Sequence, residues 1–257
     1  MLKIENLTKV YPTGTVALKD VSFEVQNGEF LVIIGLSGSG KSTLLRCINR
    51  LIEPTSGKIY WDGEDVTQYK GQDLRNYRRK IGMIFQQFNL VKRSTVGTNV
   101  LSGRLGYANP WLSLLGIWPE DDRERALKAL TRVGIPDKIG NRADALSGGQ
   151  QQRVGIARAL MQEPQVILAD EPVASLDPVL AHSILQYLEQ LNKVDKMTVI
   201  CSLHFLDLVH RYGSRVIGLK DGQKVFEGLP KELDKVKFKE VYGEEAQEVR
   251  ATALEGS

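Results

Sequence analysis

The stretch that decides the fold reads Gly35-Leu36-Ser37-Gly38-Ser39-Gly40-Lys41-Ser42. It follows the apolar run 30–34 and precedes a helical run that starts at Lys41. Its glycines let the backbone turn tightly and point N–H groups at an anion, and the helix start adds positive potential. In this pattern Lys41 reaches the β- and γ-phosphates of a nucleotide, and Ser42 ligates Mg²⁺. A merely flexible glycine-serine turn would not need the Lys-Ser ending, so residues 35–42 predict a phosphate loop.

Outward from this loop, the sequence alternates strand and helix patterns. Four continuously apolar runs predict parallel strands buried on both faces: residues 30–34, 166–169, 198–201 and 216–219. Apolar and polar residues alternate in two predicted half-buried strands: residues 21–25 and 57–63. Helical spacing of apolar residues occurs at 127–133 and 180–191, and the Asp221-Gly222 turn predicts a late hairpin. Strands that alternate with helices indicate an α/β fold, with a helical insertion over residues 87–161.

Two acids end the apolar run 166–169. Asp170 and Glu171 therefore lie at the carboxyl edge of the predicted sheet, where ligands of open α/β folds bind. Adjacent strand residues face opposite ways, so Asp170 would hold Mg²⁺ while Glu171 would polarise an attacking water as general base. A solvated strand end before Pro172 is the alternative, and the phosphate loop makes it the weaker one.

A second predicted anion site lies in the helical insertion. Leu146-Ser147-Gly148-Gly149-Gln150 reads as a serine-capped helix start with two adjacent glycines. With this segment, hereafter the signature segment, the sequence resembles the ATP-binding subunits of ABC transporters from Leu2 to about Gly243.

The resemblance implies a P-loop ABC ATPase core, which is a RecA-like, mainly parallel sheet with an antiparallel β part, plus a helical subdomain. It predicts a nucleotide-binding domain over residues 1–230 and a C-terminal tail over 231–257. Within the domain, the core lobe would comprise 1–86 and 162–230, and the helical subdomain 87–161.

Four further positions match family motifs. Gln86 matches the glutamine that touches Mg²⁺ and water, and His204 matches the switch histidine that contacts the γ-phosphate. Asp177 matches the D-loop, although Ser-Leu-Asp-Pro could equally be a simple cap and turn. Tyr11 matches the aromatic residue that stacks on adenine, although a tyrosine near a Pro-Gly turn is common.

In this family each ATP lies between the phosphate loop of one subunit and the signature segment of another. The resemblance therefore implies a two-fold homodimer with ATP and Mg²⁺ as cofactors. Catalysis would fall to Glu171, His204 and Gln86, and metal binding to Ser42, Gln86 and Asp170. The implied nucleotide-binding residues are Tyr11, Gly35, Leu36, Ser37, Gly38, Ser39, Gly40, Lys41, Ser42, Thr43, Ser147, Gly148, Gly149, Gln150 and Asp177.

The subgroup is indicated by three stretches: residues 170–177, 99–106 and 215–219. They resemble the ATPases of phosphonate importers, a group that includes relatives handling phosphite. This implies a peripheral subunit on the cytoplasmic face of the cell membrane that powers uptake of phosphonates or related phosphorus oxyanions. Its partners would be transmembrane permease subunits and, indirectly, an extracytoplasmic phosphonate- or phosphite-binding protein.

Other functions remain open. The chain could serve an importer for another small solute, such as a polar amino acid, or a soluble phosphonate-degrading complex. A DNA-repair ATPase would carry a long coiled coil between the phosphate loop and the signature segment, and sustained heptads are absent there. Translation-type members usually carry two cassettes per chain, and this chain has one.

Composition excludes several classes. The 257 residues are 42% hydrophobic and 25% charged, as in ordinary globular proteins, and no run approaches the ~18–20 apolar residues that span a bilayer. A net charge of +3 gives no argument for nucleic acid, and we interpret the basic residues within 75–80 as a solvated helix face. Cys47 and Cys201 form neither a disulfide framework nor a zinc cluster.

One stretch of the insertion has two interpretations. Residues 109–119 hold two of the three tryptophans of the chain between Pro110 and Pro119. Burial within the subdomain is favoured slightly, because Trp and Leu usually serve packing. The alternative is a surface near the groove where a permease helix docks.

Overall fold

The computed structural model describes residues 1–243, so the polar segment predicted to be loosely ordered at the C-terminus lies outside the described residues. Within residues 1–243, none of the helices combines the length and the apolarity that crossing a membrane requires.

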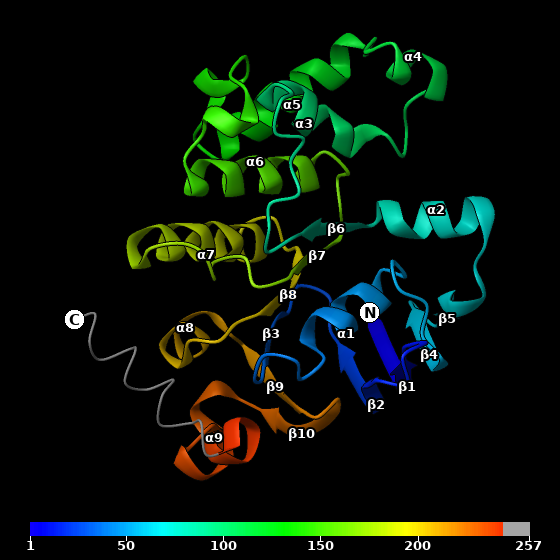
Figure 1. The fold of residues 1–257 in the computed structure, drawn as a ribbon, viewed down its shortest axis with the longest axis vertical. Coiled ribbons are helices and arrows are strands. Elements are labelled where there is room, and N and C mark those ends of the chain that lie inside the picture. Colours follow the sequence, from blue (N-terminus) through cyan, green and yellow to red (C-terminus); the bar gives the residue numbers. More distant parts are fainter. Residues whose placement is uncertain (244–257) are drawn as a thin grey trace.

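A six-stranded sheet forms the centre of the molecule, in the order β10-β9-β3-β8-β7-β6 (Figure 1). Neighbouring strands run parallel except β10, which pairs antiparallel with β9. The strands are β3 (Phe30–Ile34), β6 (Ile81–Ile84), β7 (Val166–Ala169), β8 (Thr198–Ser202), β9 (Arg215–Lys220) and β10 (Gln223–Gly228). This confirms the predicted α/β class and its mainly parallel sheet.

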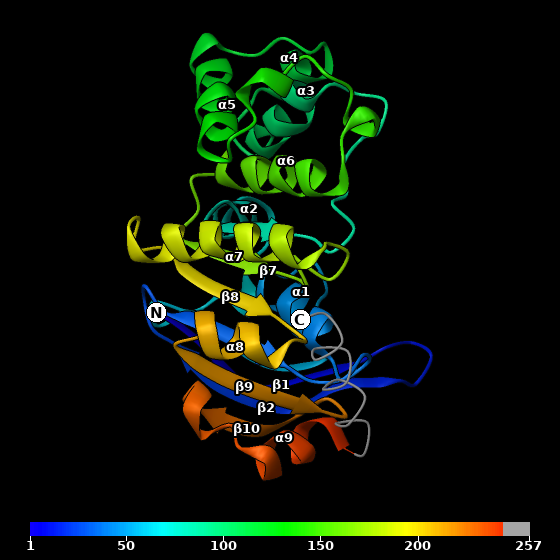
Figure 2. The same cartoon turned by 90° about the vertical axis from the view of Figure 1, so that its left-hand side faces the viewer.

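Both faces of this sheet are covered. In β3, Phe30, Val32 and Ile34 join one buried cluster, while Leu31 and Ile33 join another on the opposite face. The first face packs against α7 (Pro178–Lys193) and α8 (Leu206–Tyr212), which lie over the strands in Figure 2. Burial on two faces explains why these strands are continuously apolar rather than alternating.

The second face packs against α1 (Lys41–Ile48) and a four-stranded antiparallel sheet. The order of that sheet is β2-β1-β4-β5, formed by β1 (Leu2–Val10), β2 (Val16–Val25), β4 (Ser56–Trp61) and β5 (Glu64–Asp65). The sequence patterns predicted part of β2 and β4 but neither β1 nor β6. The antiparallel part of the predicted fold is therefore confirmed, with two further strands, β1 at its centre and β5 at its edge.

Helices α3 to α6 gather at one end of the molecule, beyond the edge strand β6 (Figure 1). They are α3 (Val96–Leu101), α4 (Pro110–Leu114), α5 (Glu120–Arg132) and α6 (Gly148–Leu160). Leu130 and Val133 are buried, as the helical periodicity over 127–133 predicted, whereas Leu127 of the same pattern is exposed.

Helix α2 (Gly71–Arg79) carries most of the basic run that was interpreted as a solvated face. That interpretation is only partly right. Arg78 Nε donates to the carbonyl oxygen of Asn49 at 3.3 Å, and Arg79 donates to the carbonyl oxygen of Gly106 in the helical insertion. Two of the basic side chains therefore tie α2 to neighbouring segments instead of facing water.

The stretch 109–119 is not buried. Trp111, Leu114 and Leu115 are 76%, 78% and 72% exposed, and Ile117 is also exposed. Helix α4 is short and is capped by Asn109, whose side chain accepts the backbone N–H of Trp111 at 2.9 Å. The favoured interpretation as a packed core segment was wrong, because none of the residues of α4 is buried against the rest of the subdomain.

The segment predicted as a C-terminal tail contains α9 (Lys235–Tyr242), which packs on β9 and β10. Phe238, Val241 and Tyr242 are buried in the same cluster as α7 and α8. Up to residue 243, the structure therefore extends the core beyond residue 230.

Candidate active site

The phosphate loop connects the end of β3 to the start of α1. Gly35 and Gly40 adopt φ angles of 149° and 103°, which residues with a side chain rarely adopt. A Cβ atom at Gly35 would lie 2.3 Å from the carbonyl oxygen of Leu219, and one at Gly40 would lie 2.4 Å from that of Ala17. Only glycine fits these two positions, and the tight turn that they allow is the kind of backbone that can face an anion.

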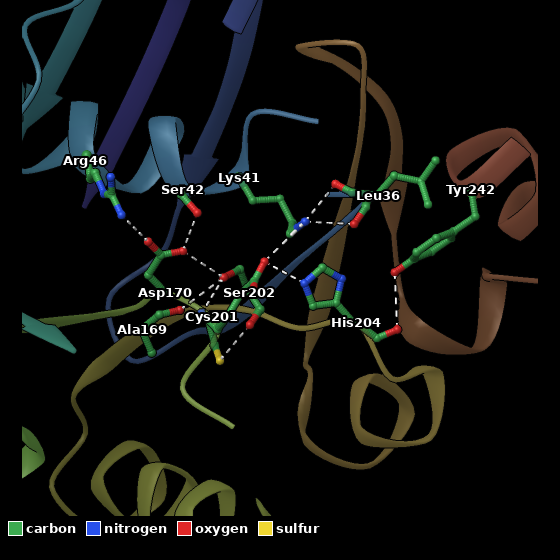
Figure 3. Close-up of polar contacts among 12 residues, drawn as sticks. Leu36, Lys41, Ser42, Arg46, Ala169, Asp170, Cys201, Ser202, His204 and Tyr242 are labelled. Carbon is green, nitrogen blue, oxygen red and sulfur yellow. Dashed lines mark hydrogen bonds and ion pairs between the residues drawn. The ribbon is translucent and has the colours of Figure 1, made fainter. Parts of the chain in front are cut away.

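Lys41 lies at the centre of the site (Figure 3). It is only 3% exposed. Its Nζ donates to the carbonyl oxygens of Gly35 and Leu36 at 2.8 and 2.9 Å and lies 3.6 Å from Glu171 Oε1. Burial lowers the pKa of Lys41, and the carboxylates of Glu171 and Asp170 oppose this shift. The ammonium group therefore pairs with the Glu171 carboxylate and donates to two carbonyl oxygens that a nucleotide phosphate could replace.

An oxygen-rich cluster adjoins Lys41. Ser42 Oγ donates to Asp170 Oδ1 at 2.7 Å, and Arg46 Nη2 lies 3.3 Å from Asp170 Oδ2. Asp170 is 1% exposed, and the buried Ser39 Oγ has no hydrogen-bond partner among the described residues. A hydroxyl beside a carboxylate is the donor set that Mg²⁺ prefers, and a buried hydroxyl without a partner suits a phosphate oxygen. The residues present fit both groups.

Glu171 follows Asp170 at the end of β7 and has a φ of +47°, which is unusual for a residue with a side chain. Its backbone N–H donates to Ser202 Oγ at 2.8 Å, and this contact fixes the turn. Glu171 Oε1 lies 2.5 Å from His204 Nε2. The hydrogen bond from His204 lowers the pKa of Glu171 despite the opposing effect of burial, and the ion pair with Lys41 adds to the lowering. The carboxylate is therefore ionised at neutral pH.

Gln86 and Tyr11 border the same region. Gln86 comes two residues after β6 and is exposed, and β6 is the neighbour of β7, the strand that Asp170 follows. The backbone N–H of Asp170 donates to the carbonyl oxygen of Ile84 at 2.9 Å, which places the two loops side by side. The Tyr11 hydroxyl lies 3.2 Å from Thr43 Oγ1, so the Tyr11 side chain lies against the first turn of α1.

The signature segment forms the start of α6. Ser147 and Gln150 make a reciprocal capping box: Ser147 Oγ accepts the N–H of Gln150 at 3.4 Å, and Gln150 Oε1 accepts that of Ser147 at 3.1 Å. A Cβ atom at Gly149 would lie 2.7 Å from Leu180 Cδ1 in α7, which Asp177 caps through the N–H of Leu180. The starts of α6 and α7 are therefore packed together.

The structure brings the phosphate loop, Asp170, Glu171 and His204 into one cluster, with Gln86 and Tyr11 at its border. It does not bring the signature segment into that cluster. Within residues 1–243, no hydrogen bond or ion pair joins residues 147–150 to the phosphate loop.

Sequence reasoning missed two residues of the cluster. Ser202 is fully buried and contacts both acids, since it accepts the Glu171 N–H and lies 3.5 Å from Asp170 Oδ1. Arg46 pairs with Asp170 from the second turn of α1. A polar residue at the end of a continuously apolar strand, two positions before His204, was the available signal for Ser202.

A phosphate loop at the end of a buried strand, with two acids at the end of another, defines a P-loop nucleoside triphosphatase. The chain belongs to the ABC transporter family, whose sequence model matches residues 18–174.

Among curated proteins, the chain is 54% identical to "Phosphonates import ATP-binding protein PhnC" of Bdellovibrio bacteriovorus, over 97% of this chain and 96% of that one. It is 51% identical to "Phosphonates import ATP-binding protein PhnC 3" of Halalkalibacterium halodurans, over 96% of each chain. Among solved structures, it resembles a dimeric post-hydrolysis state of the ATP-binding cassette MJ0796 bound to ADP and Pi, with a TM-score of 0.80 and 39% identity. That match covers 90% of this chain and 99% of that one.

Proposed function

We propose that this chain hydrolyses ATP to power the uptake of phosphonates or related phosphorus oxyanions, such as phosphite, across the cytoplasmic membrane. The observation that carries the proposal is identity of 51–54% to phosphonate import ATP-binding proteins over nearly the whole length of both chains. The family fixes ATP as the nucleotide, and the complete cluster around Lys41 supports hydrolysis by this chain itself.

In the proposed site, ATP phosphates replace the carbonyl oxygens of Gly35 and Leu36 as partners of Lys41, and Ser39 gains the partner that it lacks. Ser42, Asp170 and Gln86 would hold Mg²⁺. When bound, the ion would neutralise charge that develops on the transferred phosphoryl group. Tyr11 supplies an aromatic face for adenine beside Thr43.

Glu171 acts as the general base in this proposal. Its ionised carboxylate accepts a proton from the water that attacks the γ-phosphate. His204 contacts the same carboxylate, so it orients Glu171 and lies in position to reach the γ-phosphate. Lys41 meanwhile provides countercharge for the phosphates.

The second half of each site comes from a second copy of the chain. Ser147, Gly148, Gly149 and Gln150 open α6 outside the Lys41 cluster, and Asp177 caps the adjacent α7. A two-fold, head-to-tail dimer would place these helix starts against the partner's nucleotide. The dimeric form of the related cassette MJ0796 supports this arrangement.

The division into lobes follows the same proposal. Residues 1–86 and 162–230 form the core lobe that binds nucleotide, and residues 87–161 form the helical subdomain. Residues 231–257 follow as the C-terminal segment, of which α9 packs on the core lobe. The gathering of α3 to α6 beyond the sheet supports the helical unit (Figure 1).

The chain acts at the cytoplasmic face of the membrane by docking on transmembrane permease subunits, which an extracytoplasmic phosphonate- or phosphite-binding protein supplies with solute. A groove of about 270 Å³ lies between the core lobe and the helical subdomain, and Phe85, the residue before Gln86, lines it. Its lining includes Asn49, Leu51 and Arg78 on one side and Ser102, Gly106 and Arg158 on the other. The exposed apolar residues of 111–117 add a docking surface in the same subdomain.

Trp111→Asp tests the docking surface. Since Trp111 is 76% exposed, the isolated subunit should keep its ATP affinity and a melting temperature within about 2 °C of wild type, while permease co-purification is lost. Val225→Asp, an exposed apolar position on β10, serves as the matched control and should retain the permease. Unchanged co-purification of the Trp111 variant would contradict this role. A melting temperature lower by several degrees would show that Trp111 instead stabilises the fold of the isolated subunit.

The solute is tested with the reconstituted transporter. We expect its ATPase rate to rise when a binding protein loaded with an alkylphosphonate or phosphite is added, and to stay at the basal rate with the unloaded protein. Stimulation by an amino acid or a sugar, without stimulation by phosphonates, would exclude the proposed solute class. Co-purification with soluble phosphonate-degrading subunits instead of permease would exclude the importer.

A further inference from the structure

Arg158, near the end of α6, makes a contact that the proposed ATPase cycle does not use. Its guanidinium group donates from Nη2 to the carbonyl oxygen of Phe88 at 2.8 Å and from Nη1 to that of Asn89 at 2.5 Å. Phe88 and Asn89 come two and three residues after Gln86. The helix that begins with the signature segment therefore holds the backbone of the Gln86 loop at its other end.

The loop has a conformation that needs such support. Phe88 and Asn89 have φ angles of 50° and 49°, so two consecutive residues with side chains occupy the left-handed region. Arg158 holds both of their carbonyl oxygens at once, and the planar guanidinium group suits this two-point contact better than an ammonium group.

The Phe88 side chain also lies along α6 and extends toward the signature segment. A Cβ atom at Gly155 would lie 3.8 Å from the carbonyl oxygen of Phe88, and one at Gly148 would lie 3.9 Å from the tip of its ring. Phe88 thus spans from the Arg158 end of α6 to the glycine after Ser147. Residues 86–89 therefore contact α6 at two places: at Arg158 near its end, and beside Gly148 in the signature segment.

We infer that Arg158 is a positioning residue, which makes the Gln86 loop and the signature segment move as one unit. A displacement of Gln86 in one site is then passed through Phe88, Asn89 and α6 to Ser147, which faces the partner's nucleotide. Arg158 also lines the groove between the lobes, so a partner bound in that groove would contact the residue that joins the Gln86 loop to α6. The inference rests on ATP hydrolysis by paired cassettes and not on the identity of the solute.

Arg158→Met is the direct test, because methionine keeps an unbranched side chain but removes both donors. ATP affinity, measured by titration calorimetry in a Glu171→Gln background, should stay within about twofold, since the phosphate loop lies in the other lobe. The ATPase kcat of the full-length chain and the ATP-dependent dimerisation of the Glu171→Gln protein should both fall by about 2- to 30-fold. Arg158→Lys, which keeps a charged donor, should recover part of both losses.

Arg153→Met is the matched control on the same helix. Arg153 also donates to a carbonyl oxygen, that of Val133, and to Ser183 Oγ at 2.7 Å, but these partners lie outside the Gln86 loop. It should keep a kcat near wild type. A wild-type kcat in Arg158→Met would overturn the inference. The inference would also be overturned if Arg158→Met lost ATP affinity by the same factor as kcat, or if Arg158→Lys recovered neither loss. The same kcat loss in Arg153→Met would overturn it as well.

Discussion

Replacing Glu171 by Gln is expected to lower the ATP turnover number by about 10²–10⁴-fold while ATP binding is retained. Glutamine keeps the size of the side chain and can still accept a hydrogen bond from His204, but it cannot accept the proton of the attacking water. The lowered pKa of Glu171 means that wild type holds the competent, ionised base at neutral pH, so the whole population loses it. Phosphate release under saturating ATP, together with titration calorimetry, measures the two quantities.

The same variant should accumulate as an ATP-bound dimer, because closure of the pair needs nucleotide whereas opening needs hydrolysis. Size-exclusion chromatography with ATP would detect it. Glu163→Gln is a matched control, since Glu163 also has a positive φ, of 52°, and pairs with an arginine, Arg125, away from the site. Wild-type turnover in Glu171→Gln would remove Glu171 from its proposed role.

Lys41→Ala is expected to abolish tight nucleotide binding itself, because it removes the main countercharge of the β- and γ-phosphates. A charge-assisted contact is worth about 1.5–3 kcal/mol, so the ATP affinity should fall by at least tenfold, and more if both phosphates are contacted. Titration calorimetry with ATP is the measurement.

The fold should survive this substitution. Lys41 is 3% exposed, and its loss leaves the carbonyl oxygens of Gly35 and Leu36 and the carboxylate of Glu171 without their partner, so a lower melting temperature is expected. Lys58→Ala removes an exposed lysine that pairs with Asp65 and should bind ATP normally. Equal affinity in Lys41→Ala and wild type would refute the assignment.

Much of the site was predictable because its signals are local. The phosphate loop, the acids that end β7 and the serine-capped start of α6 each occupy a few consecutive residues whose types follow from backbone geometry. Gly35 and Gly40 are required by positive φ angles and close approaches, and Ser147 by the unpaired N–H groups of a helix start. The four buried strands were predictable for a similar reason, since burial on two faces leaves a continuous apolar run.

The missed strand β6 shows where this reasoning ends. Its four residues, Ile-Gly-Met-Ile, include Gly82, which is normally unfavourable in a strand. A Cβ atom there would lie 2.8 Å from Ile167 Cδ1 and 3.1 Å from Pro164 Cγ, so the glycine leaves room for side chains from outside its own segment. The local sequence around Gly82 does not indicate that β6 pairs with β7.

By itself, therefore, the sequence determined the class of fold, the phosphate loop, the acids and the family. Only the tertiary structure decided which atoms meet: Lys41 with Glu171, Glu171 with His204, Ser202 with both acids and Arg158 with the Gln86 loop. It also decided that Trp111 faces outward, because the same apolar residues can be buried or exposed. Composition and periodicity indicate which residues tend to be buried. The contacts of a buried residue depend on distant segments of the chain that folding brings beside it.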